Sequence, residues 1–253
     1  MTDPALVAED PSPAGPSRAG GTADGRAGPP GRHTAPRSHW LREIVVVVLV
    51  ALVVALLLRV FVVQTFFIPS GSMEPTLQVG DRILVNKLSY HLHGVGRGDI
   101  VVFSRPPAEN CGGPEVNDLV KRVIGLPGET LSLSGGHVYV DGRALDESWL
   151  PASAQGVTRP GPGGTLYSLQ HAYKVPADDY FVMGDNRGNS YDSRFWGTVP
   201  RSEILGEPIA IYMSVDAPGD AWNGNIAERF LAYGNALIHP GKIRWKRLFE
   251  TFR

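Results

Sequence analysis

Cysteine is nearly absent from this 253-residue chain, which contains only Cys111. One cysteine cannot form an internal disulfide framework or a cysteine-rich metal site. Charge is also sparse: charged residues make up 19% of the sequence, and the formal net charge is −1 at pH 7. A protein that binds nucleic acid through bulk positive charge needs a strong excess of lysine and arginine. The composition therefore excludes that class of protein, and folding must depend on an ordinary hydrophobic core.

Large apolar side chains are scarce in the first 38 residues, which hold seven prolines, six glycines, four acidic residues and four arginines. Such a segment cannot bury a core. We predict a disordered, Pro/Gly-rich tail over residues 1–41.

A long apolar run follows the tail. Residues 44–63 contain one charge, Arg59, and as a helix they span roughly 30 Å, the thickness of a bilayer core. A buried strand is rarely this long, and a cleaved signal peptide has a shorter leading segment and a small-residue cleavage site after the run. We predict one transmembrane helix over residues 42–63. The sequence shows no second apolar run of this length, so we expect a single crossing.

Arginines flank this run unequally. The twenty residues before it hold four arginines, and the twenty after it hold only Arg82. Positive residues favour the cytoplasmic side of a membrane. We therefore expect residues 1–41 to be cytoplasmic and residues 64–253 to form an extracytoplasmic domain. The four arginines are Arg26, Arg32, Arg37 and Arg42.

Short strand-like runs, separated by glycine, proline and Asp-Gly pairs, continue after the apolar run. The pattern indicates a mainly β fold class, an antiparallel β domain preceded by one transmembrane helix. Residues 131–133 and 138–140 form the clearest hairpin. A Pro/Gly-rich stretch suggests an insertion at about residues 145–175. The runs are Arg82–Asn86, Asp99–Phe103, Val120–Ile124, Thr130–Leu133, Val138–Val140, Tyr180–Met183 and Ile209–Ser214.

Two polar motifs interrupt the apolar pattern. Residues 68–77 read Ile-Pro-Ser-Gly-Ser-Met-Glu-Pro-Thr-Leu, where prolines stiffen the backbone around Ser70 and Ser72. Taken alone, this motif is more typical of a turn beside a membrane than of a reactive site. In residues 120–129, Lys121 and Arg122 interrupt an apolar strand, and period-two alternation points at least one of them inward. A half-exposed pair of strands has the same pattern.

A third motif reads Met-Gly-Asp-Asn-Arg-Gly-Asn-Ser-Tyr-Asp-Ser-Arg-Phe-Trp-Gly over residues 183–197. Its short polar side chains are typical of local turns or a packed polar network. A calcium loop has a similar composition, but only Asp185 and Asp192 are acidic here and no glutamate occupies the closing position. We therefore expect no metal at this motif.

Taken in order, the three motifs make the sequence resemble the bacterial type I signal peptidases, membrane-anchored serine proteases that remove signal peptides from exported proteins. Gly80-Asp81 and Gly98-Asp99 also match that family. The resemblance extends from the apolar run to about Ser214. It does not include the tail or the residues after about Asp216, and the disulfide found in some members cannot form here.

The resemblance implies a Ser–Lys dyad in which Ser72 is the nucleophile and Lys121 is its general base. None of the seven histidines lies in a motif-like setting, so a histidine-based triad has no candidate. A lysine with its ordinary pKa of about 10.4 is neutral in less than about one molecule in a thousand at pH 7, so the base must be buried. The resemblance also implies an oxyanion hole made by the Ser72 N–H and the Ser70 hydroxyl, and a hydrogen bond from Ser190 that orients the lysine amine.

The same resemblance implies two supporting ion pairs, Arg122 with Asp185 and Asp192 with Arg194. It further implies a pocket for small residues, typically alanine, at the first and third positions before the cut bond. We expect exported preproteins and the lipid bilayer as partners, with no nucleic acid and no cofactor. Seven apolar residues match the family's pocket positions, although each could also be ordinary core: Phe66, Ile68, Met73, Leu77, Val102, Leu119 and Val120.

Other functions remain open at this point. A self-cleaving Ser–Lys protease of the LexA type shares the chemistry, but the apolar run and the lack of a helix-turn-helix candidate argue against it. A catalytically inactive, membrane-anchored adaptor would keep the same fold. An enzyme with a penicillin-recognising Ser-x-x-Lys motif is excluded, because Met73 and Pro75 stand three residues after the two serines.

The C-terminal residues 242–253 carry five lysines or arginines and one glutamate, with apolar residues near helical spacing. A short helix packed on the domain has this pattern. We predict instead that the segment forms a helix on anionic lipid.

Overall fold

The structure is a computed structural model that describes residues 40–109, 117–216 and 226–252. The disordered tail expected over residues 1–41 therefore lies, apart from Trp40 and Leu41, outside the described residues. Cys111 lies outside them as well.

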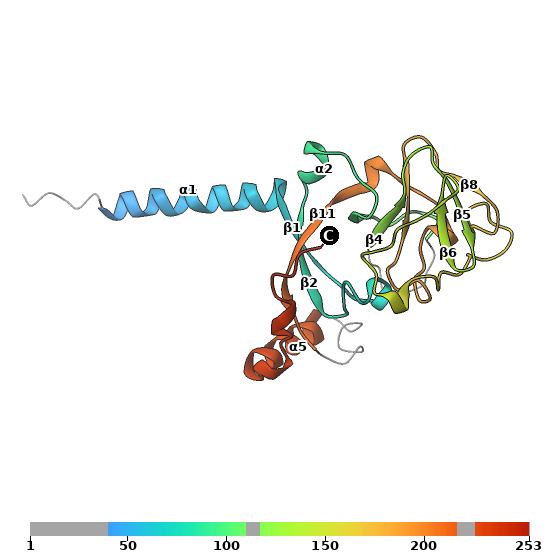
Figure 1. The fold of residues 1–253 in the computed structure, drawn as a ribbon. Coiled ribbons are helices and arrows are strands. Elements are labelled where there is room, and N and C mark those ends of the chain that lie inside the picture. The colour runs from blue at the N-terminus through green and yellow to red at the C-terminus, as the bar shows by residue number, and fades with distance from the viewer. Residues whose placement is uncertain (1–39, 110–116, 217–225, 253) are drawn as a thin grey trace, which may run out of the picture. The chain divides into compact units, whose positions relative to one another are not determined.

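The first element is helix α1, Trp40–Phe61 (Figure 1). Among the described residues it is the one helix long and apolar enough to cross a membrane, and none of its residues from Trp40 to Leu57 is buried. From Trp40 to Leu57 its large apolar side chains are exposed, as in a helix that has lipid for a neighbour. The helix ends two residues before the expected limit of residue 63, because Val63 already belongs to a strand.

Seven antiparallel strands form the larger sheet, in the order β1-β2-β11-β3-β4-β9-β10. The long strand β11 connects its two parts, because its last residues pair with β2 and its first residues pair with β3. Figure 1 shows β1, β2 and β11 side by side. The strands are β1 (Val63–Phe67), β2 (Asp81–Asn86), β3 (Ile100–Ser104), β4 (Asp118–Gly125), β9 (Asp179–Met183), β10 (Val199–Pro200) and β11 (Ile204–Ser214).

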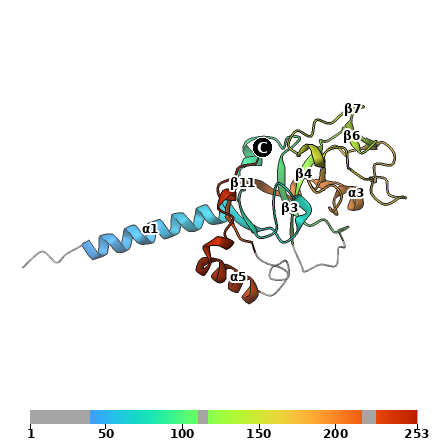
Figure 2. The same ribbon diagram turned by 60° about the horizontal axis from the view of Figure 1, so that its bottom comes forward.

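A smaller antiparallel sheet has the order β7-β6-β5-β8. Figure 1 labels β5, β6 and β8, and Figure 2 labels β6 and β7. Every strand-like run of the sequence overlaps an observed strand, so the mainly β, antiparallel fold class is confirmed. Four observed strands were not predicted, namely β1, β7, β8 and β10. Strand β1 continues directly from the apolar run, and the other three have two residues each, too few for an alternation pattern to appear. The smaller sheet consists of β5 (Thr130–Ser134), β6 (His137–Val140), β7 (Arg143–Ala144) and β8 (Tyr173–Lys174).

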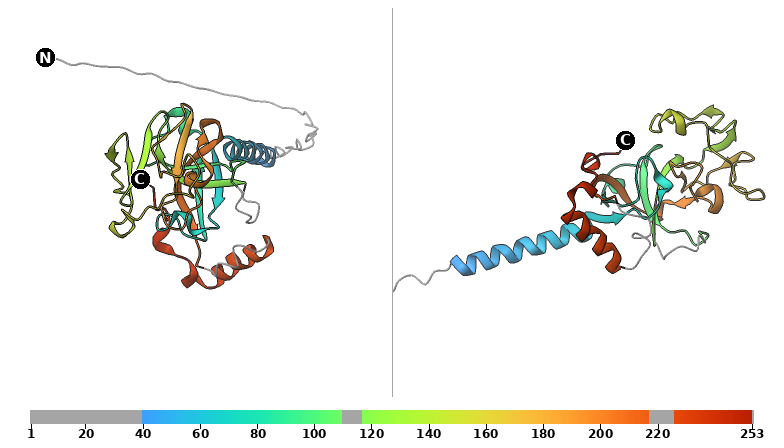
Figure 3. Two further views of the ribbon diagram at one scale, coloured as in Figure 1. Left: turned by 90° about the vertical axis from the view of Figure 1, so that its right-hand side faces the viewer. Right: turned by 90° about the horizontal axis from the view of Figure 1, so that it is seen from below.

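Short helices fill the connections. Figure 3 shows α5 at the periphery of the sheets, drawn in red. The helices after α1 are α2 (Ser89–Leu92), α3 (Ser193–Trp196) and α5 (Ile226–Ile238), and the 3₁₀ helices are η1 (Gly71–Met73), η2 (Ala152–Ala154), η3 (Arg201–Glu203), η4 (Pro240–Lys242) and η5 (Trp245–Arg247).

Residues 145–175, the stretch suggested as an insertion, pack against the smaller sheet. Leu150 and Leu169 are buried, and Leu169 belongs to the same apolar cluster as Leu131 and Val138 of the hairpin. The Thr158 N–H donates to the Gly136 carbonyl at 3.1 Å. The stretch therefore covers the hairpin with its own buried side chains.

The helix predicted over residues 242–253 is wrong. Of helical structure, the described residues 242–252 contain only the end of the 3₁₀ turn η4 and the 3₁₀ turn η5, and Ile243 forms a β-bridge with Val215. The Phe249 N–H donates to the Ile211 carbonyl at 2.7 Å. The Phe249 bond to β11 and the Ile243 bridge to Val215, the residue after β11, use backbone groups that a helix would pair internally, so the segment is fixed to the sheet between its short turns.

The alternating side chains of β3 separate two apolar clusters. Val101 and Phe103 lie in one cluster, while Ile100 and Val102 lie in the other. Strand β4 pairs with β3 in register, with Lys121 opposite Val101 and Arg122 opposite Ile100. Directly opposed residues of antiparallel strands share a face, so Lys121 and Arg122 belong to opposite faces of the sheet.

Candidate active site

Ser72 lies in η1, within the connection between β1 and β2. We call residues 68–80 the Ser72 loop. Its two ends are joined by hydrogen bonds, from the Gly80 N–H to the Ile68 carbonyl at 3.1 Å and from the Ile68 N–H to the Asp81 carbonyl at 2.9 Å. Met73 and Leu77 are buried, and they fix the loop to the apolar cluster of Ile100 and Val102.

Lys121 reaches this loop from β4. Its Nζ atom donates to Ser72 Oγ at 2.6 Å, although 49 residues separate the two in sequence. The lysine is 4% exposed. Burial lowers the pKa of its ammonium group from 10.5 to about 8, against the opposing effect of the carboxylates of Asp192, Glu109 and Asp185. With that pKa, about one lysine in ten is neutral at pH 7 and able to accept a proton.

The two other serines are placed differently. The Ser70 hydroxyl donates to Ser72 Oγ at 3.4 Å, so the two hydroxyl groups lie side by side. Ser190 is buried, and its Oγ has no hydrogen-bond partner among the described residues. The expected hydrogen bond between Ser190 and the Lys121 amine is therefore absent here, whereas Nζ donates to Ser72 Oγ.

Arg122 and Asp185 form a doubly hydrogen-bonded pair. Arg122 Nε lies 2.8 Å from Asp185 Oδ1, and Nη2 lies 2.7 Å from Oδ2, with both side chains almost fully buried. Arg122 Nη1 also donates to the Gly98 carbonyl at 2.7 Å. A buried charge pair is tolerated when its remaining polar groups are satisfied, as they are here.

Asp192 and Arg194 form a second buried pair in the third motif. Arg194 Nε and Nη2 each lie 2.8 Å from one carboxylate oxygen of Asp192. Asp192 Oδ2 also accepts from the Gly184 N–H at 3.0 Å, and Arg194 Nη1 donates to the Arg159 carbonyl at 2.8 Å. This pair therefore fixes both ends of the third motif to each other and to the segment at residue 159.

Sequence reasoning missed three residues that hold this site together. The Thr76 hydroxyl donates to Asp185 Oδ2 at 2.5 Å. The Asn186 N–H donates to the Ser72 carbonyl at 3.1 Å, and its Nδ2 donates to the Gly71 carbonyl at 3.0 Å. Buried Arg187 pairs with Glu147 and donates to Thr158 Oγ1 at 3.1 Å. Thr76, Asn186 and Arg187 all lie inside the recognised motifs, but no sequence signal specified their partners.

The seven expected pocket residues do not all lie together. Ile68, Met73, Leu77 and Val102 are buried in one apolar cluster, with Phe66 and Val120 packed against it. Leu119 packs against the other cluster, because alternation along β4 directs it to the face opposite Val120. Leu119 therefore shares the face of Lys121.

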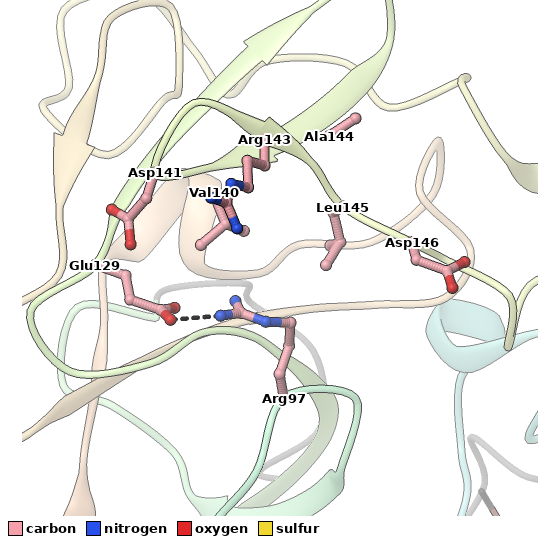
Figure 4. Close-up of a pocket in the computed structure, with 8 residues that line it drawn as sticks. All are labelled: Arg97, Glu129, Val140, Asp141, Arg143, Ala144, Leu145 and Asp146. Atoms are coloured by element: carbon pink, nitrogen blue, oxygen red, sulfur yellow. Dashed lines mark hydrogen bonds and ion pairs between the residues drawn. The ribbon is translucent and has the colours of Figure 1, made fainter.

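Two hollows in the described surface lie apart from the Ser72–Lys121 contact. One of about 590 Å³ is lined by charged and small residues around the Arg97–Glu129 ion pair, and none of the expected catalytic or pocket residues lines it (Figure 4). The other, of about 330 Å³, includes Arg122 and Trp149 in its wall. Neither hollow is lined by Ser72 or Lys121.

The family model and the relatives that match this chain are described as signal peptidases. The family model of signal peptidase, peptidase S26, matches residues 41–213. Signal peptidase I of Leptolyngbya laminosa is 43% identical over 171 residues, which are 67% of this chain and 78% of that protein. Signal peptidase I of Aquifex aeolicus is 31% identical over 252 residues, which are 79% of this chain and 95% of that protein.

A solved structure, that of a signal peptidase I from Enterococcus faecalis, is 33% identical and covers 46% of this chain and 97% of its own. Its TM-score of 0.36 is too low for a comparison of the two folds in detail. The sequence relatives and the family model are sufficient, because the matched residues 41–213 of the family model include all three motifs and the relatives are at least 31% identical over 67% or more of this chain. The chain therefore belongs to the signal peptidase family, peptidase S26, as a serine endopeptidase of the signal peptidase I type.

Proposed function

We propose that this chain is a membrane-anchored endopeptidase that removes N-terminal signal peptides from exported preproteins, with Ser72 and Lys121 as its catalytic dyad. The observation that carries the proposal is the 2.6 Å contact between Lys121 Nζ and Ser72 Oγ, made by a lysine that is 4% exposed. A serine hydroxyl is a weak nucleophile until a neighbouring base accepts its proton. A buried lysine is suited to that role, because desolvation favours the neutral amine.

The reaction has two halves. Ser72 Oγ attacks the carbonyl carbon of the scissile bond while its proton moves to Lys121 Nζ. The lysine then donates this proton to the leaving amine, the C–N bond breaks, and an acyl-enzyme remains. In the second half, water attacks the ester carbonyl, gives its proton to Nζ, and Ser72 recovers a proton as it leaves.

Two donors are suitable for the oxyanion of each tetrahedral intermediate. The Ser72 N–H and the Ser70 hydroxyl belong to the same short loop, and the hydroxyl lies 3.4 Å from Ser72 Oγ. Donors fixed in this way stabilise the developing negative charge without reorganising. The carbonyl of Ser72 is itself held by the Asn186 N–H at 3.1 Å, which restrains the peptide unit of the nucleophile.

Small side chains before the cut bond fit the apolar surroundings of the loop. The cluster of Ile68, Met73, Leu77 and Val102 is closely packed, so it leaves little room for a large substrate residue. The buried pairs of Arg122 with Asp185 and Asp192 with Arg194 hold the surrounding loops in place.

Anchoring to the bilayer completes the proposal. Helix α1 is exposed, apolar and 22 residues long, which suits a single transmembrane anchor. We place residues 1–41 in the cytoplasm and the β domain outside it, where exported preproteins emerge. The chemistry requires no metal, no cofactor and no nucleic acid.

Cleavage of a purified preprotein by the detergent-solubilised full chain tests the proposal. Ser72→Ala and Lys121→Ala should each abolish nearly all cleavage, because nucleophile and base act as a unit. Ser134→Ala, on an exposed serine of β5 in the smaller sheet, should leave the rate unchanged. Ser190→Ala should have a milder effect than the dyad variants, since its hydroxyl makes no hydrogen bond to Lys121 here.

Each alternative function has its own outcome in this assay. An inactive adaptor would show no cleavage by the unmodified chain. A self-cleaving protease of the LexA type would cut its own chain and leave the preprotein intact. Undiminished cleavage by either dyad variant would reject the assignment of Ser72 and Lys121.

A further inference from the structure

The C-terminal residues 240–252, which we call the C-terminal strap, lie outside residues 41–213 that match the family model. The strap is largely exposed, yet two of its arginines are turned inward. The side chains of Arg244 and Arg247 are 24% and 14% exposed. Both lie against the Ser72 loop and the start of β2.

Asp81, the first residue of β2, is the centre of these contacts. It is fully buried and its carboxylate accepts four hydrogen bonds, from the Gln78 N–H at 2.8 Å, from Ser214 Oγ at 2.6 Å, and from Nη2 and Nε of Arg247 at 2.7 Å and 3.4 Å. Arg247 is thus the nearer of two cations that neutralise a buried carboxylate at the end of the Ser72 loop, and Arg244 Nη2 lies 3.8 Å from the same carboxylate. Such a pairing needs fixed geometry, because an unpaired buried charge is strongly unfavourable.

The same nitrogen of Arg247 also holds the loop itself. Arg247 Nη2 donates to the Thr76 carbonyl at 2.8 Å, four residues after the nucleophile. Arg244 adds a second set of contacts, with Gln78 Oε1, with the Val79 carbonyl and with the Val215 carbonyl at 2.9 Å. The later half of the Ser72 loop is therefore bonded to the strap along its length.

Thr76 connects the strap to the base. Its hydroxyl donates to Asp185. Asp185 in turn accepts hydrogen bonds from Nε and Nη2 of Arg122, the residue next to Lys121. A continuous chain of hydrogen bonds thus extends from Arg247 through the nucleophile's loop to the strand that carries the base. On the other side of η1, Asn186 holds the carbonyls of Gly71 and Ser72.

We infer that the C-terminal strap sets the position of Ser72 against Lys121, and that Arg247 is the positioning residue through which it acts. The inference rests on the proposed Ser72–Lys121 dyad. The Ser72 loop has little regular structure of its own, only the three residues of η1, so its geometry depends on these outside contacts. A shift of about 1 Å between reacting groups can lower a rate about a hundredfold.

The test uses the full chain in detergent, with a preprotein as substrate and rates corrected for the folded fraction. Arg247→Gln should lower kcat at least about tenfold and leave KM within about twofold, because it displaces the nucleophile without removing substrate contacts. The acidic limb of the pH–rate profile should also move to higher pH, since a loosened loop admits water to Lys121. Arg247→Lys keeps the charge but not the fork of donors, so its kcat should fall by about threefold or more and remain above that of Arg247→Gln.

A double variant shows whether Thr76 carries the effect. Thr76→Val removes the hydroxyl that bonds Asp185 and keeps the volume of the side chain. If Arg247 acts through Thr76, Arg247→Gln combined with Thr76→Val should lower kcat by clearly less than the product of the two separate losses. If the loss of kcat in the double variant equals the product of the two single losses to within about twofold, the two effects are independent and the inference is contradicted.

The controls separate this inference from the proposed function. Arg143→Gln makes the same substitution at an exposed arginine of β7 and should change neither kcat nor the pH profile. If Ser72→Ala or Lys121→Ala cleaves like the unmodified chain, the dyad is wrong and the strap has no dyad to position. If both dyad variants are inactive while Arg247→Gln keeps its kcat and pH profile in the folded fraction, the strap inference alone is overturned. Should Arg247→Gln fail to fold, Arg247→Lys decides between the outcomes. A loss of kcat together with an acidic limb of the pH–rate profile moved to higher pH supports the inference. A kcat and a pH profile equal to those of the unmodified chain overturn it.

Discussion

The Lys121 ammonium group is surrounded by protein, and Ser72 Oγ is its one described hydrogen-bond acceptor. Burial lowers its pKa to about 8, so the neutral, basic form increases as pH rises towards that value. We expect log kcat/KM for preprotein cleavage to rise with a slope near one below about pH 8 and to level off above it. Steady-state rates of cleavage between pH 6 and 10 measure this rise of kcat/KM with pH. A profile that is flat from pH 6 to 9 would show that Lys121 is not the base.

The same burial makes Lys121 a source of instability. Its pKa is lower in the folded state than in the unfolded chain, so between about pH 8 and 10.5 the unfolded chain binds more protons and stability rises with pH. Below this window the full cost applies, about 3 kcal/mol. Lys121→Met, of similar length, should therefore abolish cleavage yet raise the free energy of unfolding at pH 7, with the gain lost by about pH 10.5. Chemical denaturation of both proteins at pH 7 and at about pH 10.5 measures this difference in the free energy of unfolding. If Lys121→Met were no more stable than the unmodified chain at pH 7, the prediction would be contradicted.

At the scale of elements, the third motif approaches the Ser72 loop so closely that one position must be glycine. A Cβ atom at Gly184 would lie 2.3 Å from the Ser72 carbonyl oxygen and 2.3 Å from Ser190 Oγ. Gly184→Ala should therefore displace the nucleophile and lower kcat at least about a hundredfold, with a loss of thermal stability. Gly188→Ala in the same loop is the matched control, because a Cβ there meets no atom within 4 Å. Activity near that of Gly188→Ala would show that the loop can move aside.

Sequence patterns predicted elements more successfully than they predicted contacts. Alternation and turn residues located strands β2 to β6, β9 and β11, since each has enough residues for a period to show. The spacing of residues 242–253 predicted a helix, but backbone bonds to β11 and to Val215 fix them to the sheet, and such tertiary pairing leaves no local signal. The motifs contain Ser72 and Lys121, so the sequence points to these two residues. It does not predict the hydrogen bond between Thr76 and Asp185, because these residues are 109 apart in sequence and meet only in the folded chain.

Two aromatic side chains of the strap remain exposed, Trp245 at 60% and Phe249 at 77%. Phe249 also has a φ of 63°, an unfavourable value for a bulky residue, although its N–H is bonded to Ile211. We expect these rings to lie in the interface of an anionic bilayer, where aromatic rings are favoured. Deleting residues 242–253 is an unsuitable test, because it would also remove Arg244 and Arg247, the two cations paired with Asp81.

Lipid with brominated acyl chains gives a more specific measurement, because bromine quenches nearby tryptophan fluorescence. In anionic vesicles containing the full chain, Trp245→Phe should remove a large part of the lipid-dependent quenching. Trp149→Phe, which changes a partly buried tryptophan of the domain, should not. Equal effects of the two substitutions would indicate that the strap does not contact lipid.

At the scale of the whole molecule, cleavage of an exported preprotein requires the β domain and the emerging substrate to be on the same side of the membrane. The four arginines before the apolar run, against one after it, favour a cytoplasmic tail. The single cysteine allows a direct measurement, because Cys111→Ser gives a chain without thiols. In that background one thiol can be introduced at exposed Leu166 of the domain or at Ser17 of the tail.

A membrane-impermeant maleimide added to bacterial spheroplasts then reports which side each thiol occupies. Leu166→Cys should be labelled in intact spheroplasts, since we expect the domain to be extracytoplasmic. Ser17→Cys should be labelled only after the membrane is permeabilised, because the arginines retain the tail inside. The opposite pattern would place the Ser72–Lys121 site in the cytoplasm, on the side where preproteins have not yet crossed. Labelling of both thiols in intact spheroplasts would mean that residues 40–61 do not separate two compartments.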